Sequence, residues 1–469
     1  MRTVEKVNAL ALGLIIWIVL VLSALQLTAF NLDFYKEQYA HRDTAEMIGV
    51  SDNDLLAVTQ VLLDYTSGIR EDMNVSVVID GVEQPYYNQR EIDHMVDVRV
   101  LYLNVIQIRN ILALFAVFNL SALFIYKRKL IVKELQFGLT WVSIALGSLL
   151  LIIGSFAVID FDTFWTAFHK VFFSNDLWLL DPNTDRLINM VPEGFFIDLI
   201  VMIVTHFGLA LLSLFTILQA IKDKGINQNM LKVIAVITMT IDHVGYFMFP
   251  EIRELRIIGR IAYPIFTYLF ALSYRYSGNK IKLLGRLTIF AVLGNALIMA
   301  AGATDFVNIL FLFILGWFGF MAIDSLQNKF LSVITVALLA YVAETFGVDY
   351  GAYGILTLTI FYTCHEKKLL QYGLFSLLTI LFSFQWLIVN LINDPAYASN
   401  LPYIFSRGIY SFTSYFPQSF AILALIPIAL YVYKSPKDKK AWTYTFNQYF
   451  YYFYYPIHFA LLAYLHYHG

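Results

Sequence analysis

The sequence predicts an all-α polytopic membrane protein with about 13 transmembrane helices and a small extracytoplasmic α+β cap between the first two. Of its 469 residues, 59% are hydrophobic and only 14% are charged, and the mean hydropathy is +0.66. A soluble domain is closer to half apolar and a quarter charged. Apolar runs of about twenty residues recur along the chain, and lysine and arginine gather in alternate connections, as in cytoplasmic loops.

Composition also excludes several function classes. The formal net charge is −2, and no basic patch interleaved with aromatic residues occurs, so we expect no nucleic-acid partner. The single cysteine, Cys364, ends an apolar run and is more typical of a packed thiol than of a nucleophile. The sequence suggests neither a metal site nor an obligate protein partner.

The first elements in order are a membrane anchor and a polar segment. Residues 9–30 are apolar throughout, and Arg2 and Lys6 precede them, which predicts a cytoplasmic N-terminus and a permanent first span. Residues 31–108 are rich in acidic side chains and should be extracytoplasmic. Within them, residues 75–79 resemble a strand entering a tight turn at Asp80-Gly81, which predicts a small folded cap.

Three further spans complete a first unit at residues 1–222. Residues 111–126, 135–159 and 195–221 are the predicted spans, and a second external segment covers residues 160–194. The strongest positive-inside signal follows the second span and consists of Lys127, Arg128, Lys129 and Lys133.

The most informative stretch is residues 88–101. If it is helical, Arg90, His94, Asp97 and Leu101 share one face, so the histidine lies between an arginine and a carboxylate that can set its tautomer and pKa. The alternative is an amphipathic helix on the membrane surface with a solvated charged face.

The second external segment carries another histidine. His169 lies among aromatic residues that are typical of the membrane interface, and Arg186 follows a turn at Asp181-Pro182-Asn183. Two histidines on one membrane face suggest a shared site, but spacing alone leaves open whether they meet.

Two long blocks resemble the lipoprotein intramolecular transacylase (Lit) family, over about residues 1–222. They read Y-Y-N-Q-R-E-I-D-H-M-V-D-V-R and F-H-K-V-F-F-S-N-D-L-W-L-L-D-P-N-T-D-R-L-I-N-M-V-P-E-G-F-F. The resemblance implies a four-span bacterial membrane enzyme that moves an acyl chain from the diacylglyceryl group of a lipoprotein to the α-amine of its N-terminal cysteine. It also implies that His94 and His169 are catalytic and that diacylglyceryl lipoproteins and membrane lipid are the partners.

That chemistry suits two imidazoles. An α-amine has a pKa near ~8, so it needs a base at neutral pH, and histidine is the natural one. The second histidine would stabilise the oxyanion and protonate the leaving glycerol oxygen. No cofactor is needed in this half. Arg90 and Arg186 are candidates for holding substrate carbonyls, and Asp97 for orienting His94.

Residues 228–469 have a different character, because external segments are short and about nine further spans are predicted. This count places the C-terminus outside the cell. Polar residues inside apolar runs are costly and usually functional. Those in this half are Asp242, His243, Arg260, Asp349 and His458. The alternative is that buried Asp–Arg pairs only fix helix packing.

Four blocks in this half resemble the TraX family of integral membrane proteins. They are L-K-V-I-A-V-I-T-M-T-I-D-H-V-G, L-R-I-I-G-R-I-A-Y-P-I-F, D-Y-G-A-Y-G-I-L and Y-Y-F-Y-Y-P-I-H-F. The resemblance implies transfer of an acetyl or other acyl group from acetyl-CoA or another acyl-CoA. Asp242 and His243 are then the candidate catalytic pair, with Arg260, Asp349 and His458 near the substrate.

The sequence therefore predicts a multi-pass enzyme of the bacterial cell membrane, in which a transacylase unit is fused to a second acyltransferase unit. Two alternatives for the second unit remain, a lipid transporter or flippase and a non-catalytic scaffold. A transporter should contain paired structural repeats with broken helices, and we detect no such sequence repeat.

Overall fold

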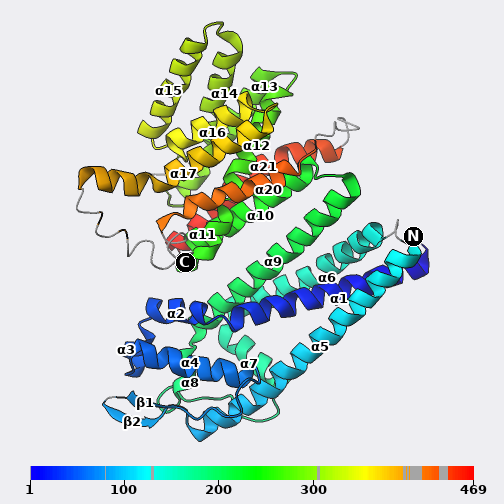
Figure 1. The fold of residues 1–469 in the computed structure, drawn as a ribbon, viewed down its shortest axis with the longest axis vertical. Helices are drawn as coiled ribbons and strands as arrows, with labels where there is room; N and C mark the ends of the chain where they lie inside the picture. Colours follow the sequence, from blue (N-terminus) through cyan, green and yellow to red (C-terminus); the bar gives the residue numbers. More distant parts are fainter. Residues whose placement is uncertain are drawn as a thin grey trace. The chain divides into compact units, whose positions relative to one another are not determined.

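The computed structural model describes residues 2–79, 81–127, 131–303, 307–394, 398, 401, 415–432 and 442–468 (Figure 1). The chain divides into two compact units, Met1–Lys222 and Asp223–Gly469. Three residues used in the sequence-based predictions lie outside the described part of the chain, and they are Asp80, Arg128 and Lys129.

The first unit is almost entirely helical. Its elements in chain order are α1 (Thr3–Ala29), α2 (Leu32–His41), α3 (Thr44–Ile48), α4 (Asp52–Thr66), β1 (Ser76–Ile79), β2 (Val82–Pro85), α5 (Gln89–Lys127), α6 (Ile131–Ile159), α7 (Phe161–Phe172), α8 (Arg186–Met190) and α9 (Glu193–Asp223). Four of these helices, α1, α5, α6 and α9, are long and apolar enough to cross a membrane.

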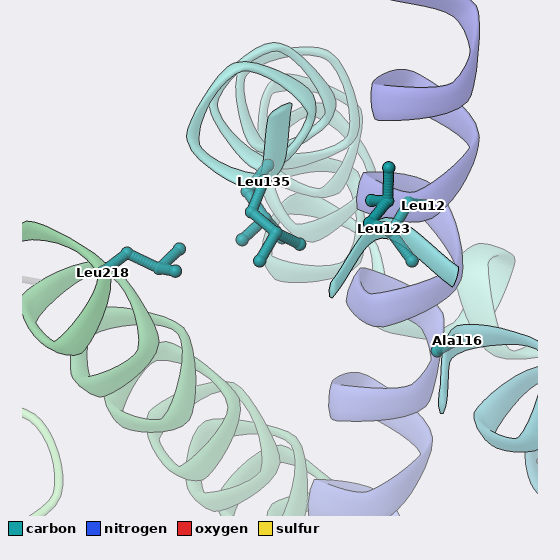
Figure 2. Close-up of a cluster of buried hydrophobic side chains, with 6 residues drawn as sticks. Leu12, Ala116, Leu123, Leu135 and Leu218 are labelled. Carbon is teal, nitrogen blue, oxygen red and sulfur yellow. The ribbon is translucent and has the colours of Figure 1, made fainter. Parts of the chain in front are cut away.

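The four long helices share a buried apolar core (Figure 2). Leu12 of α1, Leu123 of α5, Leu135 of α6 and Leu218 of α9 all belong to it. Helices α1 and α6 approach closely where both carry glycine, since a Cβ at Gly138 would meet the backbone of Ala9 and one at Gly13 would meet the backbone of Gly138. Small residues allow this kind of contact between membrane helices.

The segment between α1 and α5 folds into a small cap. The predicted strand is present, and β1 pairs with β2 in an antiparallel hairpin. Buried Asp198 of α9 pairs with Arg42, which follows α2, at 2.5 Å, so the cap is tied to the helical bundle.

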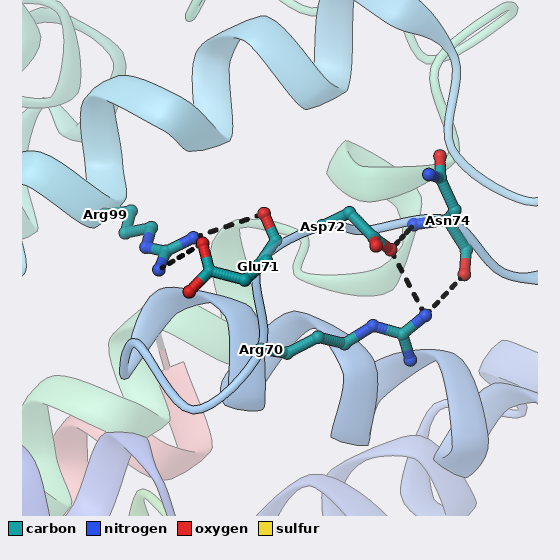
Figure 3. A network of polar contacts seen from close by, with 5 residues as sticks. All are labelled: Arg70, Glu71, Asp72, Asn74 and Arg99. Atoms are coloured by element: carbon teal, nitrogen blue, oxygen red, sulfur yellow. Dashed lines mark hydrogen bonds and ion pairs between the residues drawn. The ribbon is translucent and has the colours of Figure 1, made fainter.

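The loop between α4 and β1 is fastened to α5 (Figure 3). The Arg99 guanidinium of α5 lies 3.9 Å from the Glu71 carboxylate and over the ring of Tyr65 at 4.6 Å. Within the loop, Arg70 donates to the Asp72 carboxylate at 3.2 Å and to the Asn74 carbonyl at 2.7 Å. These contacts support the N-terminal half of α5, the helix that carries His94.

Helix α5 is longer than the sequence indicated. Residues 89–101 are helical, which is the conformation that places His94 between Arg90 and Asp97. They form the first turns of one continuous helix of 39 residues that also contains the second predicted span.

The second unit contains helices of more varied length. They are α10 (Gln228–Phe247), α11 (Arg253–Gly259), α12 (Ala262–Arg275), α13 (Lys280–Ala300), α14 (Ile309–Ser325), α15 (Lys329–Thr345), α16 (Gly351–Thr363), α17 (Lys368–Asn393), η2 (Pro417–Ala424), α20 (Leu425–Ala429) and α21 (Trp442–His468).

Eight membrane-length apolar helices are present in the described part of the whole chain, four of them in the second unit. Those four are α10, the combined segment Arg253–Arg275, α13 and α17. Three shorter apolar helices, at Ile309–Ser325, Gly351–Thr363 and Pro417–Ala429, coincide with further predicted spans. The helical fold is thus as predicted, while the total of about 13 spans stays a prediction.

Candidate functional site

The structure brings His94 and His169 together. His94 lies in the second turn of α5 and His169 in the last turn of α7, and their ring centroids are 6.4 Å apart. Both side chains are buried, with exposed fractions of 8% and 5%. No hydrogen bond between the two rings is present, so they do not occupy each other's nitrogen atoms.

The backbone fixes the tautomer of His169. Its Nδ1 lies 2.8 Å from the carbonyl oxygen of Trp165, one helical turn earlier. A carbonyl only accepts, so Nδ1 carries the proton, and in the neutral ring Nε2 keeps the lone pair. Burial lowers the pKa of His169, and the hydrogen bond to Trp165 opposes this shift. The ring is therefore a neutral Nε2 base near neutral pH.

His94 differs because its Nδ1 atom is buried without a protein hydrogen-bond partner. An unpaired buried polar atom costs about 1–3 kcal/mol and marks a candidate functional position. Because this nitrogen belongs to the ring that faces His169, a substrate group between the two rings would give it a partner.

Aromatic rings line the pair. Phe173 contacts both histidines, at centroid distances of 5.5 Å to His94 and 5.7 Å to His169. Trp178 stacks on His169 at 4.7 Å, and Trp165 meets its edge at 4.4 Å. The sequence indicated an aromatic-rich segment but gave these rings only an interfacial role. The structure makes them walls that reduce the access of water.

Helix α7 also carries exposed apolar side chains. Phe168, Val171 and Phe172 are exposed by 39%, 76% and 48%. A short helix that combines buried His169 with exposed apolar groups suits the boundary between headgroups and acyl chains.

The expected substrate-binding residues of this unit instead hold its two external segments together. Arg90 donates to the carbonyls of Asp176 and Leu179 at 2.6 and 3.0 Å. The Asp97 carboxylate accepts from Asn175 at 2.8 Å and does not hydrogen-bond to His94.

Arg186 joins the same two segments, but it lies in the second segment and donates to the first. Its guanidinium donates to the carbonyl of Tyr86 at 2.8 Å and to that of Pro85 at 3.3 Å. Arg90, Asp97 and Arg186 therefore join the segment of His94 to that of His169, which explains how two distant blocks of sequence form one site.

A buried carboxylate that sequence reasoning missed strengthens this junction. Asn88 and Glu91 form a capping box at the start of α5, with the Asn88 N–H donating to Glu91 at 2.7 Å and the Glu91 N–H donating to Asn88 at 3.0 Å. The other Glu91 oxygen accepts from the Leu187 N–H at 2.5 Å. The Asn-x-x-Glu spacing was the sequence signal that could have identified this capping box.

The predicted turn at Asp181-Pro182-Asn183 is also present, since the Thr184 N–H donates to the Asp181 carbonyl at 3.0 Å.

In the second unit, His243 pairs with His458. The Nδ1 of His243 in α10 lies 2.7 Å from the Nε2 of His458 in α21, and the rings stack at 4.9 Å. Asp242, the other member of the candidate catalytic pair, contacts a different side chain. Its carboxylate lies 2.9 Å from the guanidinium of Arg256, because consecutive helical residues point in different directions.

Arg260 and Asp349 lie in the same polar region. Arg260 donates to Gln418 at 3.4 Å, and its Nε is buried without a protein partner. Asp349 lies close enough to Asp242 and Arg260 for their charges to act on its carboxyl group. Of the residues expected near this site, Asp242, Arg260 and Asp349 therefore lie close enough to interact.

In the described part of the chain, no group of three or more potential ligands (His, Cys, Asp or Glu) is arranged to hold a metal ion.

The two units match two protein families. Residues 10–196 match the family model described as lipoprotein intramolecular transacylase Lit, and residues 227–466 match the family model described as TraX protein. One curated relative is an uncharacterised protein of Rickettsia prowazekii (strain Madrid E). It is 33% identical over 150 residues, which are 31% of this chain and 58% of the relative, so the chain spans little more than half of that relative's length.

Solved structures of the lipoprotein intramolecular transacylase Lit from Bacillus cereus are also similar. One covers 48% of this chain and 100% of its own, with 20% identity and a TM-score of 0.39. A variant of the same protein covers 47% of this chain and 94% of its own, with 19% identity and a TM-score of 0.38. The TraX match spans just over half of the 469 residues. The chain therefore belongs to the TraX family, and its first unit carries a Lit-like domain.

Proposed function

We propose that the first unit is a membrane acyltransferase that moves an acyl chain within a bacterial lipoprotein, from the diacylglyceryl group to the amine of the N-terminal cysteine. The observation that carries this proposal is the pair of buried imidazoles, His94 and His169, whose centroids are 6.4 Å apart. The match of residues 10–196 to the Lit family model supports it.

The two rings take different roles. The cysteine amine attacks the ester carbonyl carbon, and His169 Nε2 accepts the proton that the nitrogen loses. A new C–N bond forms, the C–O bond to glycerol breaks, and the glycerol oxygen takes the proton back from His169 Nε2, which restores the neutral ring. His94 stays neutral and donates its N–H to the carbonyl oxygen while negative charge develops there. The fixed tautomer of His169 supports this assignment.

Most of the rate enhancement comes from positioning, because amine and ester belong to one molecule. Effective concentrations in well-oriented systems reach ~10⁵ M or more. The aromatic walls of Trp165, Phe173 and Trp178 reduce competing hydrolysis of the ester. No step needs a cofactor.

A crossover experiment tests this function. Purified protein is given two diacylglyceryl lipopeptides that differ in peptide sequence, one with deuterated acyl chains. Intramolecular transfer yields N-acylated lyso-lipopeptides in which the deuterated acyl chain is found only on the peptide that carried it at the start. Mixed products, or no N-acylation, would refute the proposal.

The second unit has its own proposed function, transfer of an acyl group from acetyl-CoA or another acyl-CoA at His243. The His243–His458 hydrogen bond is the observation that favours it over a flippase or a scaffold. Labelled acetyl-CoA and membranes containing the intact protein provide the test. Transfer that His243→Ala abolishes supports an enzyme, while a silent variant supports a scaffold.

Both reactions would take place in a multi-pass protein of the bacterial cell membrane, with the N-terminus cytoplasmic and the C-terminus extracytoplasmic. The eight apolar helices support the membrane location, and the orientation rests on the distribution of lysine and arginine.

A further inference from the structure

A chain of hydrogen bonds in the second unit connects the backbone of α21 to the ring of His243. His458 Nδ1 lies 2.7 Å from the carbonyl oxygen of Tyr454, one turn earlier in α21. His458 Nε2 lies 2.7 Å from His243 Nδ1. The two histidines are 215 positions apart in sequence, so the arrangement is purely tertiary.

The direction of each bond follows from the first acceptor. A carbonyl oxygen only accepts, so His458 Nδ1 must donate, and the neutral ring then presents a lone pair on Nε2. That lone pair accepts the proton of His243 Nδ1. If His458 instead donated from both of its nitrogens, its ring would be doubly protonated and positively charged. Burial among apolar helices disfavours that charge. The lone pair of His243 is therefore on Nε2.

Other groups are not available to set this tautomer. The nearest carboxylate in sequence, Asp242, is engaged with Arg256 at 2.9 Å. Phe459 meets the His243 ring edge-on at 4.9 Å, and Tyr455 lies at 6.2 Å. His458 stacks on His243 with an interplanar angle of only 14°, and its own ring stacks on Tyr454 at 4.7 Å.

We propose that His458 is a positioning residue that holds His243 as an Nε2 base, which takes a proton from the nucleophile of the acyl acceptor during acyl transfer. This role differs from the substrate-binding role that the sequence indicated, and it rests on the proposed acyltransferase function of the second unit. The nucleophile, an N–H or O–H group, attacks the carbonyl carbon of an acyl thioester, and its proton goes to His243 Nε2. The bond from the nucleophile to the carbonyl carbon forms, the C–S bond breaks, and the thiolate takes the proton back from Nε2.

His458 stabilises the stage of this cycle at which His243 is doubly protonated. While His243 carries both protons, its Nδ1–H remains bonded to a neutral acceptor, and hydrogen bonds that involve a charged group are stronger than neutral ones. The ring is also prevented from rotating, so Nε2 keeps one direction. Both effects are lost if His458 has no acceptor atom.

Reactivity of His243 towards diethyl pyrocarbonate tests the proposal without requiring acyl transfer. The reagent modifies the unprotonated imidazole nitrogen, and mass spectrometry locates the adduct in the intact, detergent-solubilised protein. We expect modification of His243, a rate about tenfold lower in His458→Ala, and recovery in His458→Gln, whose amide oxygen replaces the acceptor. His466 is the matched control, because its Nδ1 also donates to a carbonyl, that of Phe247 at 2.8 Å. His466→Gln should leave the rate at His243 unchanged.

Nitrogen-15 spectra of histidine-labelled wild-type protein provide the second readout and do not depend on the folding of any variant. We expect the His243 proton on Nδ1. A proton on Nε2, or an unchanged rate in His458→Ala, would overturn the proposal. If the His243 proton is found on Nδ1 and the His458 variants behave as expected, but labelled acetyl-CoA is not transferred, only the proposed acyltransferase function fails.

Discussion

At the scale of single residues, the chemistry of the first site depends on where one proton lies. The Trp165 carbonyl holds the proton of His169 on Nδ1, and Nδ1 of His94 is buried without a protein hydrogen-bond partner. Two histidines with different surroundings can act as proton acceptor and hydrogen-bond donor in one reaction. This asymmetry is a property of the folded site, since both residues have the same intrinsic chemistry.

The pH dependence of transacylation follows from the burial of His169. Burial lowers its pKa below the ordinary value of 6.5, and the neutral ring is the base. A pH–rate profile on a purified lipopeptide should therefore contain two ionisations, that of the substrate amine near ~8 and that of His169 below pH about 6.5. A profile with no ionisation below pH about 6.5 would show that His169 is not a desolvated base.

The same shift predicts how stability changes with pH. Between the lowered pKa of folded His169 and the ordinary value of 6.5, the unfolded chain binds more protons than the folded protein. The free energy of unfolding should thus fall as pH drops through this window. Thermal unfolding of wild type and His169→Gln across this range measures the contribution. An equally steep fall in the variant would contradict it.

Sequence reasoning at this scale pointed to the histidines but did not supply the contacts that the candidate site residues make in the folded protein. His94 and His169 were found because each lies in a long recognisable block. Asp242 is next to His243 in sequence, yet adjacent helical residues do not face each other. The true partner, His458, is contributed by another helix, and no local pattern encodes that contact. Arg90, Asp97 and Arg186 were expected at the substrate because charge alone does not distinguish a ligand contact from a bond between segments.

At the scale of elements, the start of α5 determines how the two histidines meet. Glu91 accepts hydrogen bonds from Asn88 and from Leu187, so it caps its own helix and holds the second external segment. The sequence predicted the helix correctly from its periodicity. It did not predict that the helix continues into the membrane, because a polar first half and an apolar second half look like separate elements.

Replacing Glu91 tests this junction. Glu91→Ala leaves the Leu187 N–H unpaired and should destabilise the protein by about 1–3 kcal/mol and slow transacylation by moving His169 away from His94. Gln89→Ala on the same helix is the control, because Gln89 bonds only to exposed Asp93 at 2.8 Å. Thermal unfolding and lipopeptide turnover provide the readouts. Equal effects of both substitutions would contradict a special role for Glu91.

The close packing of α1 against α6 leads to a second prediction at this scale. A Cβ at Gly138 would meet the Ala9 backbone, whereas one at Gly147 of the same helix meets nothing within 4 Å. Gly138→Ala should lower the thermal midpoint in detergent. Gly147→Ala should leave it unchanged or raise it, since alanine favours a helix over glycine by about 1 kcal/mol. A neutral Gly138→Ala variant would contradict the close packing.

At the scale of the whole molecule, the two units have separate histidine pairs and separate family matches. The composition of the chain was sufficient to predict a helical membrane protein. The number of spans was harder to predict, because short helices such as Gly351–Thr363 are apolar but contain fewer residues than a bilayer crossing needs.

Because each unit contains its own histidine pair, the two sites should act independently. His243→Ala in the full chain should then leave lipoprotein transacylation within about twofold of wild type, since substitutions at independent sites do not couple. The fragment of residues 1–222 should likewise retain transacylation. A second acyl product should be lost in both cases. Loss of transacylation in a folded His243→Ala protein would instead show that the two units act as one.

The central claim is that His94 and His169 transfer one acyl chain within a lipoprotein, and mass spectrometry of a lipoprotein N-terminus tests it most directly. Cells expressing the wild-type protein should yield an N-acylated cysteine with a monoacylglyceryl thioether. Cells expressing His169→Ala at equal levels should yield a diacylglyceryl thioether with a free amine. The same N-acylated product from both would contradict the account.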